Sequence, residues 1–472
     1  MHMHAYQLFS QRCEILLSPS AYHLFAVPSN VLRQDWARAL FSSYSADIPQ
    51  EVIKGGWIKV FQYWRQGDFV DLLQCRVMVV GNKEVGKTSL IRALRSEDGR
   101  APHVSYRTQG IDVDVLPLTF EDSQLVCSLW DFAGQEIYYL SHTVHFSRRC
   151  IFCLVWSHVY TNTDDFSSSC ELDLEREILR PLFTWLQMLA HYVPNAQIVL
   201  IGSHSQLNMS LFSSTSAKVQ ERMEKEAQRL NDCLQRERVA LHITLKQLHD
   251  DKHRCLEACV SQGLCEEFGH DSDLLSFCKQ TPFPHDSMLC ELRELVLKYD
   301  EVRCRLCKLS GRFDFSDPLE DDKTSQLQMN CVVELDSRSD PESIRRFKND
   351  LKEVAMSMSF IRQESKVPKW YREALGFVHQ LEKTEPDAAL SKKYKLGSAF
   401  IARRKIASIV QSQLMRAEFP RQKSQQEIWD CLSFWSDLGE TFVYDCPIFY
   451  LFFNTNACIS GTRSFFYATQ CF

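Results

Sequence analysis

Eight residues, from Gly81 to Thr88, have the composition of a phosphate-binding loop and read Gly-Asn-Lys-Glu-Val-Gly-Lys-Thr. Glycines let the backbone wrap around an anion, whose charge meets the N–H groups at the start of the following helix. Lys87 would neutralise the β and γ phosphates of a nucleotide, and the Thr88 hydroxyl would bind Mg²⁺. An ordinary glycine-rich turn is the alternative, but the position between an apolar strand and a helix favours a triphosphate site. The predicted nucleotide-binding residues of this loop are Gly81, Asn82, Lys83, Glu84, Val85, Gly86, Lys87, Thr88 and Ser89.

A second motif, Trp-Asp-Phe-Ala-Gly-Gln, spans residues 130–135 at the end of another apolar run. Asp131 can hold Mg²⁺ through a water molecule, and the backbone N–H of Gly134 can reach the γ phosphate. Gln135 can orient the attacking water, so it is the predicted catalytic residue. An Asp-x-x-Gly run alone is usually a turn, but its position downstream of the phosphate loop favours a functional site.

Between the two motifs, Thr108 lies in the stretch Arg-Thr-Gln-Gly-Ile-Asp at 107–112. A threonine there can add a hydroxyl ligand to Mg²⁺ when the γ phosphate is present, so the loop would respond to the nucleotide. A plain loop residue is the alternative. The predicted metal ligands are Thr88, Thr108 and Asp131.

Each of these motifs requires a strand that ends where the motif begins. From Arg76 onward, short Val/Ile-rich runs that could form such strands alternate with segments of helical length. Short apolar runs bounded by turn residues are typical of strands buried on both faces of a mainly parallel sheet. The sequence therefore predicts an α/β fold with a Ras-like, doubly wound sheet. The predicted strands are Arg76–Val80, Ile111–Leu116, Leu125–Trp130, Cys150–Trp156, Gln197–Ile201 and Cys331–Leu335. The predicted helices between them are Lys87–Arg95 and Leu172–His191.

The alternation breaks after Leu207, and the sixth strand appears only near Asn330, which predicts a large insertion at about 208–329. The insertion begins with a charged helical pattern over Ser216–Arg238, becomes irregular, and ends with a helix around Met288–Leu309. Its cysteines raise the question of zinc, but only Cys304 and Cys307 have CxxC spacing, and no second such pair accompanies them. Ordinary thiols are the better interpretation.

Length, charge and cysteine usage limit the possible classes of protein. The 472 residues leave room for two or three domains. A net charge of -6, with basic residues scattered among acidic ones, argues against nucleic acid and acidic membranes as partners. The 19 cysteines are spread over core-like and helical runs, which favours reduced thiols. No apolar run reaches the roughly 18 residues of a membrane span, and the N-terminus lacks a signal-peptide pattern, so we expect a cytoplasmic protein.

The phosphate loop and the Asp131 motif, in this order, resemble the Roc (Ras of complex proteins) family of GTPases, found in leucine-rich-repeat kinases and related scaffolds. Upstream, residues 47–64 are similar to the stretch that links a leucine-rich repeat array to Roc. Downstream, Val332–Ile344 is similar to the last strand and the base-contacting loop of Roc, which implies base contacts from Ser337 and Arg338. The resemblance implies GTP and GDP as ligands, Mg²⁺ as cofactor and hydrolysis of GTP.

Two later stretches, Val367–Leu375 and Leu432–Val443, are similar to the opening and the middle of the COR domain that follows Roc in this family. Each alone could be an ordinary amphipathic helix or strand, but their order after a Roc-like region is informative. The resemblance implies a shortened α+β COR domain and a homodimer through Roc and COR. The predicted domains are a remnant at 1–46 like the end of a repeat array, a linker helix at 47–73, a Roc domain at 74–360 and a partial COR domain at 365–472.

The sequence departs from the family at the guanine motif Thr-His-x-Asp, which here reads Ser203-His204-Ser205-Gln206. The family's aspartate accepts both guanine N–H groups in charge-assisted hydrogen bonds, which the neutral Gln206 cannot reproduce. Gln206 can still offer its carbonyl oxygen to one guanine N–H. The predicted base-side residues are therefore Ser203, His204 and Gln206, together with Ser337 and Arg338.

Two functions from different classes fit these patterns. The first is an active GTPase switch, which the set Lys87, Thr88, Asp131 and Gln135 favours. The second is a scaffold whose Roc fold binds nucleotide weakly and serves as a protein interaction module, which Gln206 and the long insertion favour. The sequence contains no kinase His-Arg-Asp or Asp-Phe-Gly set, so we expect no kinase activity from this chain.

Overall fold

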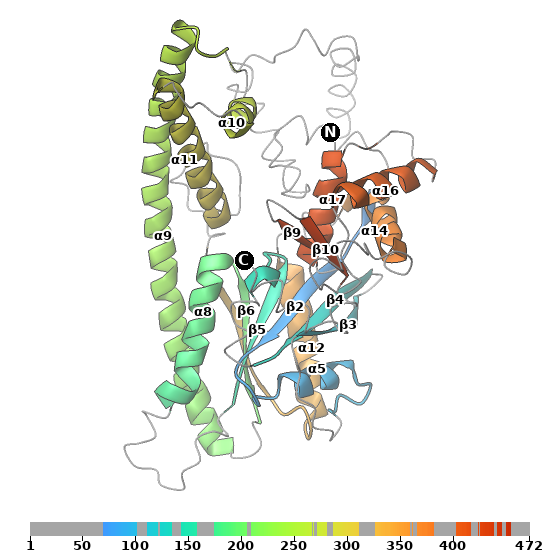
Figure 1. Cartoon of the computed structure of the whole chain (residues 1–472). Coiled ribbons are helices and arrows are strands. Elements are labelled where there is room, and N and C mark those ends of the chain that lie inside the picture. Colours follow the sequence, from blue (N-terminus) through green and yellow to red (C-terminus); the bar gives the residue numbers. More distant parts are fainter. Residues whose placement is uncertain are drawn as a thin grey trace, which may run out of the picture. The chain divides into compact units, whose positions relative to one another are not determined.

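The structure is a computed structural model that describes most residues from Phe69 to Asn454 (Figure 1). These residues divide into two compact units, one made of Ile243–Arg303 and the other of the residues within Asp47–His242 and Cys304–Phe472. The described residues are 69–101, 111–120, 123–134, 143–157, 174–204, 209–266, 268, 271–280, 287–310, 326–358, 361, 366–381, 403–416, 423, 425–438, 441–445 and 450–454.

The larger unit contains a six-stranded sheet in the order β3-β4-β2-β5-β6-β7. Neighbouring strands from β4 to β7 run parallel, and β3 pairs antiparallel with β4 at one edge. The predicted mainly parallel α/β sheet is confirmed, with each strand somewhat longer than predicted. The strands are β2 (Gln74–Val80), β3 (Ile111–Phe120), β4 (Ser123–Phe132), β5 (Cys150–Ser157), β6 (Gln197–Ser203) and β7 (Gln328–Leu335).

The largest underestimate concerns β3, which continues four residues beyond the predicted end at Leu116. The sequence pattern stops there because Pro117 follows, and proline cannot donate a backbone hydrogen bond within a sheet. Pro117 nevertheless pairs with Val126 of β4. An edge strand tolerates proline because one side of the strand needs no partner, so the strand passes through it.

Alternate residues of the central strand β2 belong to two separate cores. Cys75, Val77 and Val79 pack in one core, together with α5 (Lys87–Arg95) and α12 (Pro341–Ser357). Met78 and Val80 pack in the other core, together with α8 (Arg180–Tyr192). All seven residues of β2 are buried, as expected of a strand covered on both faces. Helices on both sides of one parallel sheet make the fold doubly wound, with β2 in its interior (Figure 1).

The segment predicted as one helix over Leu172–His191 contains two kinds of helix, and residues 172 and 173 lie outside the described ranges. Leu174–Leu179 form a π-helical turn, η4, which leads directly into α8. Pro181 stands in the first turn of α8, where a missing N–H costs little. Short π-helical segments are rare and are found mostly at functional sites.

Within the insertion, the structure contradicts one expectation, because the stretch after Arg238 is not irregular. The helix α9 spans 53 residues, from Met209 to Ser261. Lys252 lies in the second half of this helix and is buried although charged, with its ammonium group 4.1 Å from the ring centre of Tyr299. A cation over an aromatic face lets the charged residue occupy a buried position.

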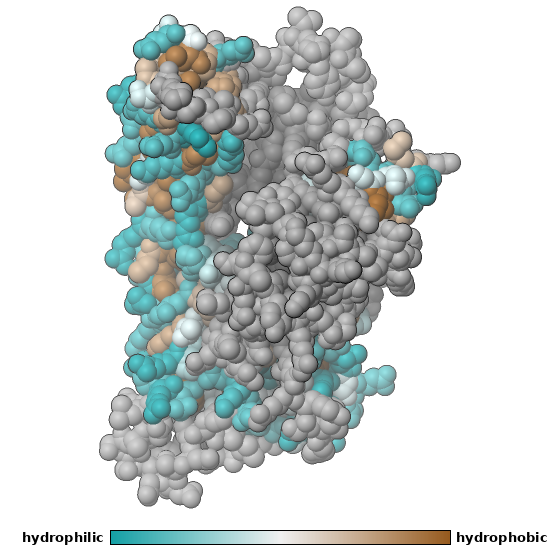
Figure 2. All heavy atoms as spheres, viewed as in Figure 1, coloured by the Kyte–Doolittle hydropathy of each residue, from teal (hydrophilic) through white to brown (hydrophobic). Residues whose placement is uncertain are grey.

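The unit Ile243–Arg303 is built from the end of α9, α10 (Asp271–Gln280) and most of α11 (Ser287–Ser310). Its small core combines thiols with aliphatic side chains: Cys259, Leu274, Cys278, Leu292 and Val296. Figure 2 shows hydrophobic residues scattered among hydrophilic ones along the insertion helices. None of the helices in the described ranges combines the length and the apolar character that a membrane crossing requires.

The C-terminal part of the larger unit contains α14 (Lys369–Leu381), α16 (Arg403–Arg416) and α17 (Gln425–Leu438). Two antiparallel pairs accompany these helices: β1 (Phe69–Asp71) with β8 (Lys366–Pro368), and β9 (Thr441–Asp445) with β10 (Tyr450–Asn454). The Trp435 indole donates a hydrogen bond of 2.8 Å to the backbone oxygen of Tyr371, which joins α17 to α14.

Two buried arginines of the sheet connect it to α17. Arg76 of β2 donates to the backbone oxygens of His145 and Ser436, and its guanidinium lies 4.5 Å from the ring centre of Trp130. Arg149 lies just before β5 and places its guanidinium 4.7 Å from the ring centre of Phe434. Two nitrogens of the Arg76 guanidinium meet backbone oxygens, one at His145 and one in α17, so the sheet and the C-terminal helices stabilise each other.

We expect Arg76→Met to lower the free energy of unfolding by roughly 2 kcal/mol or more, because each buried carbonyl left without a donor costs about 1 to 3 kcal/mol. Arg100→Met, at an exposed position, is the matched control and should change stability little. Urea denaturation followed by circular dichroism measures both variants. Equal stability of the two variants would contradict the role assigned to Arg76.

Candidate nucleotide site

The phosphate loop joins β2 to α5 through backbone positions that only glycine fits. Gly81 has a φ of 145°, and a Cβ added there would lie 2.2 Å from the backbone oxygen of Val155 on β5. Gly86, directly before α5, has a φ of 92°. Side chains are strained at both angles, and at Gly81 one would also collide with a neighbouring strand. The loop can therefore lie tight against the sheet edge.

The N-terminus of α5 presents backbone N–H groups at this loop. Among the described residues, no side chain caps the helix, and the backbone N–H of Leu90 is bonded to the oxygen of Gly86 at 2.9 Å. The N–H groups of the first turn, from Lys87 to Ser89, precede that bond and have no intrahelical partner. Such groups, with the helix dipole, form an anion site.

Lys87 provides a buried positive charge at the same place. Only 6% of the residue is exposed, and its Nζ donates to the backbone oxygens of Gly81 at 3.0 Å and Asn82 at 2.6 Å. Burial lowers the pKa of Lys87 to about 8, and the nearby Asp131 opposes that shift. A bound phosphate would stabilise the charged form of Lys87, because burial outweighs the effect of Asp131 when no phosphate is present.

Asp131 reaches the phosphate loop because β4 runs parallel to β2, with Asp131 beside Val79. The Thr88 hydroxyl donates to Oδ2 of Asp131 at 2.6 Å, and Asp131 is 2% exposed. Two hard oxygen donors in contact are the chemistry that Mg²⁺ prefers. A Cβ added to Gly134 would lie 2.5 Å from backbone atoms of Asn82 and Lys83, so this glycine allows the motif after β4 to touch the phosphate loop.

On the base side, the last residue of β6 contacts the same loop. The Ser203 hydroxyl donates to the backbone oxygen of Val85 at 2.7 Å. His204 has a φ of 61°, and its Nδ1 lies 3.1 Å from the hydroxyl of Ser157. Burial lowers the pKa of His204, Asp336 opposes this effect, and Arg338 adds to it. The imidazole is therefore predominantly neutral at pH 7.

The loop after β7 adjoins these residues. Asp336 Oδ1 accepts hydrogen bonds from the backbone N–H groups of Arg338 at 2.9 Å and Ser339 at 3.1 Å. The backbone oxygen of Ser337 accepts from the N–H of Ala101 at 2.7 Å, which ties the loop to the segment that follows α5. The carboxyl ends of β2, β4, β6 and β7 thus bring all these loops to one edge of the sheet.

Comparison with known proteins agrees with this arrangement. The family model described as "Ras of Complex, Roc, domain of DAPkinase" matches residues 76–206. These residues contain the phosphate loop, the Asp131 motif and the turn at His204. Residues 76–206 therefore belong to a Roc domain.

Relatives of the Roc domain include kinases and small Ras-related proteins. The chain is similar to the probable serine/threonine-protein kinase pats1 of Dictyostelium discoideum, with 28% identity over 205 residues, 38% of this chain and 6% of that protein. It is 37% identical over 109 residues to the Ras-related protein Rab-7L1 of Rattus norvegicus, which covers 22% of this chain and 52% of that protein. The matched region is thus only 6% of the length of pats1 and of the next relative, roco5 of the same organism.

Among solved structures, the chain is similar to Methanosarcina barkeri Roco2 RocCORdC bound to GDP. The identity is 14% and the TM-score is 0.41, over 82% of this chain and 74% of that one. With the family match and the Rab relatives, the Roc domain is a Ras-like domain of the GTP-binding class.

The structure places most of the predicted site residues of the Roc domain at one sheet edge, with differences in exposure. Lys83 and Glu84 are exposed, whereas Val85 and Lys87 are buried. The predicted ligand Thr108, the catalytic Gln135 and the base reader Gln206 lie outside the described residues, so their roles stay predictions.

Two residues of this edge were missed by the sequence interpretation. Ser157 ends β5 and contacts His204, and Asp336 follows β7 and interacts electrostatically with His204. The only available signal was their position at the carboxyl ends of parallel strands, where ligands of such sheets bind.

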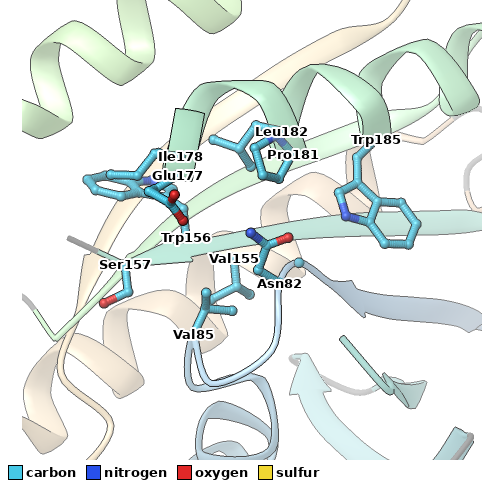
Figure 3. Close-up of a pocket in the computed structure, with 11 residues that line it drawn as sticks. Asn82, Val85, Val155, Trp156, Ser157, Glu177, Ile178, Pro181, Leu182 and Trp185 are labelled. Carbon is cyan, nitrogen blue, oxygen red and sulfur yellow. The ribbon is translucent and has the colours of Figure 1, made fainter. Parts of the chain in front are cut away.

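A shallow hollow open to solvent lies beside the phosphate loop of the Roc domain (Figure 3). Asn82 and Val85 line it from the loop, and Val155 to Ser157 line it from β5. The residues that line it from η4 and α8 include Ile178, Pro181, Leu182 and Trp185. Glu177, on the π-helical turn, adds a carboxylate to a mainly apolar wall. The π-helical turn therefore borders the phosphate loop.

We expect Lys87→Ala to weaken GTP binding by roughly tenfold to a hundredfold or more, since a charged hydrogen-bond partner contributes about 1.5 to 3 kcal/mol. Lys83→Ala removes the same charge at an exposed position of the same loop and should have a smaller effect. Isothermal titration calorimetry compares the two variants. Undiminished binding by Lys87→Ala would contradict the assignment of this loop.

Because the pKa of Lys87 is lowered to about 8, this lysine is about half protonated at pH 8 without ligand. A bound triphosphate favours the charged form and raises this pKa, so GTP binding at pH 8 should take up protons. Calorimetry in two buffers of different ionisation enthalpy measures that uptake. The uptake should persist in Lys83→Ala and vanish in Lys87→Arg, whose guanidinium stays charged.

Proposed function

We propose that this chain is a GTP-binding switch that hydrolyses GTP to GDP with Mg²⁺ inside a larger cytoplasmic signalling protein. The observation behind this proposal is the contact of Thr88 with Asp131 next to the buried Lys87, at the carboxyl edge of the Roc sheet. A buried lysine, an uncapped helix start and a pair of oxygen ligands together suit a triphosphate with its metal ion.

Each group has a distinct role toward the nucleotide in this proposal. The first-turn N–H groups of α5 and the ammonium of Lys87 bind the phosphate oxygens and neutralise their charge. Gly134, which already lies against the phosphate loop, directs its N–H toward the γ phosphate. The oxygens of Thr88 and Asp131 would hold Mg²⁺, together with Thr108. Bound Mg²⁺ would supply charge neutralisation at the β and γ phosphates.

Gln135 directly follows Gly134, so we assign it the positioning of the attacking water. Phosphoryl transfer depends on position and electrostatic stabilisation more than on a strong base. A neutral amide that can donate and accept hydrogen bonds suits that task. The guanine base is read by Ser203, His204, Gln206, Ser337 and Arg338.

We further propose that the Roc domain, at 74–360 with its insertion at about 208–329, acts on a partial COR domain at 365–472. Support comes from the buried Arg76 and Arg149, which link the sheet to α17. Homodimerisation through Roc and COR belongs to this proposal, as do the remnant at 1–46 and the linker at 47–73. The end of that linker, Phe69–Asp71, is the strand β1 and not part of the predicted helix.

A non-enzymatic scaffold is the second candidate function. Gln206 favours it, because a neutral residue there weakens guanine binding. The insertion also favours it, because the 53-residue helix α9 offers a long surface with exposed apolar residues such as Val239 and Ile243. Micromolar or tighter GTP binding with turnover would support the switch, and loss of both would support the scaffold.

The metal role of Thr88 is tested by Thr88→Val, which keeps the shape and removes the hydroxyl. Adding Mg²⁺ should strengthen GTP binding to the parent chain. The gain in affinity should be roughly tenfold or more smaller in Thr88→Val, because the variant lacks one ligand to the metal ion. Thr88→Ser keeps the hydroxyl and serves as the control. If Mg²⁺ strengthens binding equally in all three proteins, Thr88 is not a ligand.

The catalytic role of Gln135 is tested by single-turnover hydrolysis of GTP. Gln135→Leu should slow the reaction by roughly tenfold or more, because a group that acts mainly on the transition state is lost. Nucleotide affinity should stay nearly unchanged. Hydrolysis at the parent rate would remove Gln135 from the mechanism and leave the binding assignment intact.

A further inference from the structure

We propose that Asp336 supplies the carboxylate that recognises guanine, in place of the family's aspartate where this chain has Gln206. This inference rests on the proposed function and adds a specificity residue to it. Guanine presents two neighbouring N–H donors on one edge, and a carboxylate can accept both. A glutamine offers one neutral acceptor, so Gln206 leaves that edge without a charged partner.

Strand pairing places Asp336 beside the residues that read the base. The parallel strands β6 and β7 pair Ser203 with Leu335. His204 and Asp336 are the next residues, so they leave the sheet from the ends of neighbouring strands. The two side chains interact electrostatically. Asp336 is thus adjacent in space to the Ser203-His204 turn, although it is remote in sequence.

The turn and the Asp336 loop are both attached to the phosphate-binding elements. Ser203 donates to the backbone oxygen of Val85, and a Cβ added to Gly86 would lie 3.5 Å from Cε1 of His204. On the other side, the N–H of Ala101 donates to the oxygen of Ser337. A nucleotide whose phosphates lie at the N-terminus of α5 therefore extends its base toward loops that are already fixed in position.

The carboxylate of Asp336 is oriented and charged. Its Oδ1 accepts from the backbone N–H groups of Arg338 and Ser339. A carboxylate offers about four acceptor positions, so it retains capacity for further donors. Burial raises the pKa of Asp336, but these hydrogen bonds, the Ser339 hydroxyl and His204 together lower it below its ordinary value. The group is therefore ionised at neutral pH, half-buried at the sheet edge.

The test is a selectivity measurement with Asp336→Asn. This substitution preserves shape and keeps an oxygen that can accept from Arg338 and Ser339, but it replaces an acceptor with an NH₂ donor. Xanthine has a carbonyl where guanine has its amino group, so the variant should prefer XTP more than the parent does. We expect the ratio of GTP to XTP affinity to fall roughly tenfold to a hundredfold.

Asp340→Asn is the matched control, because it removes the same charge from the same loop. Asp340 caps α12 by accepting from the N–H groups of Glu342 and Ser343, and asparagine caps a helix equally well. The GTP to XTP ratio should remain at the parent value. Competition of a fluorescent GTP analogue by GTP and XTP, with thermal unfolding followed in parallel, measures all three proteins.

The outcomes separate this inference from the proposed function. A parent chain that binds GTP, with an unchanged GTP to XTP ratio in Asp336→Asn, would overturn the role of Asp336 alone. Equal weakening of GTP and XTP would also overturn it, because that result indicates a purely structural loop residue. A parent chain that binds neither triphosphate would overturn the proposed function and this inference with it.

Discussion

The burial of a positive charge at Lys87 is the constraint on which the site depends. A lysine that is only 6% exposed loses hydration, so the protein must replace that hydration with oxygen atoms. The backbone oxygens of Gly81 and Asn82 do so directly, and the Asp131 carboxylate contributes through its charge. These oxygens compensate only in part, because the pKa of Lys87 stays at about 8. The oxygens of a bound triphosphate would replace the rest of the lost hydration of Lys87. The buried charge of Lys87 can therefore favour nucleotide binding.

Close approach of backbone segments makes this arrangement possible. Gly81 lies against β5 and Gly134 lies against the phosphate loop, both at distances that exclude a Cβ. Parallel pairing of β2 with β4 sets Asp131 beside the end of β2, within reach of Thr88. The same strand β2 has Arg76 near its other end, bonded to Ser436 of α17. One buried strand thus contacts both the nucleotide edge and the C-terminal helices.

Much of the fold was predictable because its strands are apolar on both faces and end at recognisable loops. The helix Lys87–Arg95 was predicted with its observed bounds, since glycine precedes it and its apolar residues recur with helical spacing. The predicted β3 stopped before Pro117, because proline is unusual within a strand. The prediction also missed the second half of α9, where the charged Lys252 is buried against Tyr299. Asp336 was missed for another reason: its relation to His204 exists only through the pairing of β6 with β7, which the long insertion separates in sequence. The predictions for Thr108, Gln135 and Gln206 concern residues outside the described ranges.

The most direct measurement of the central claim is a calorimetric titration of the full chain with GTP, in the presence of Mg²⁺ and after removal of any bound nucleotide. The account predicts one site per chain, weaker binding when Mg²⁺ is chelated, and competition by GDP. Absence of binding at millimolar GTP, with the chain shown to be folded, would contradict the account. The buried Lys87 would then only hold the conformation of its own loop, through its hydrogen bonds to Gly81 and Asn82.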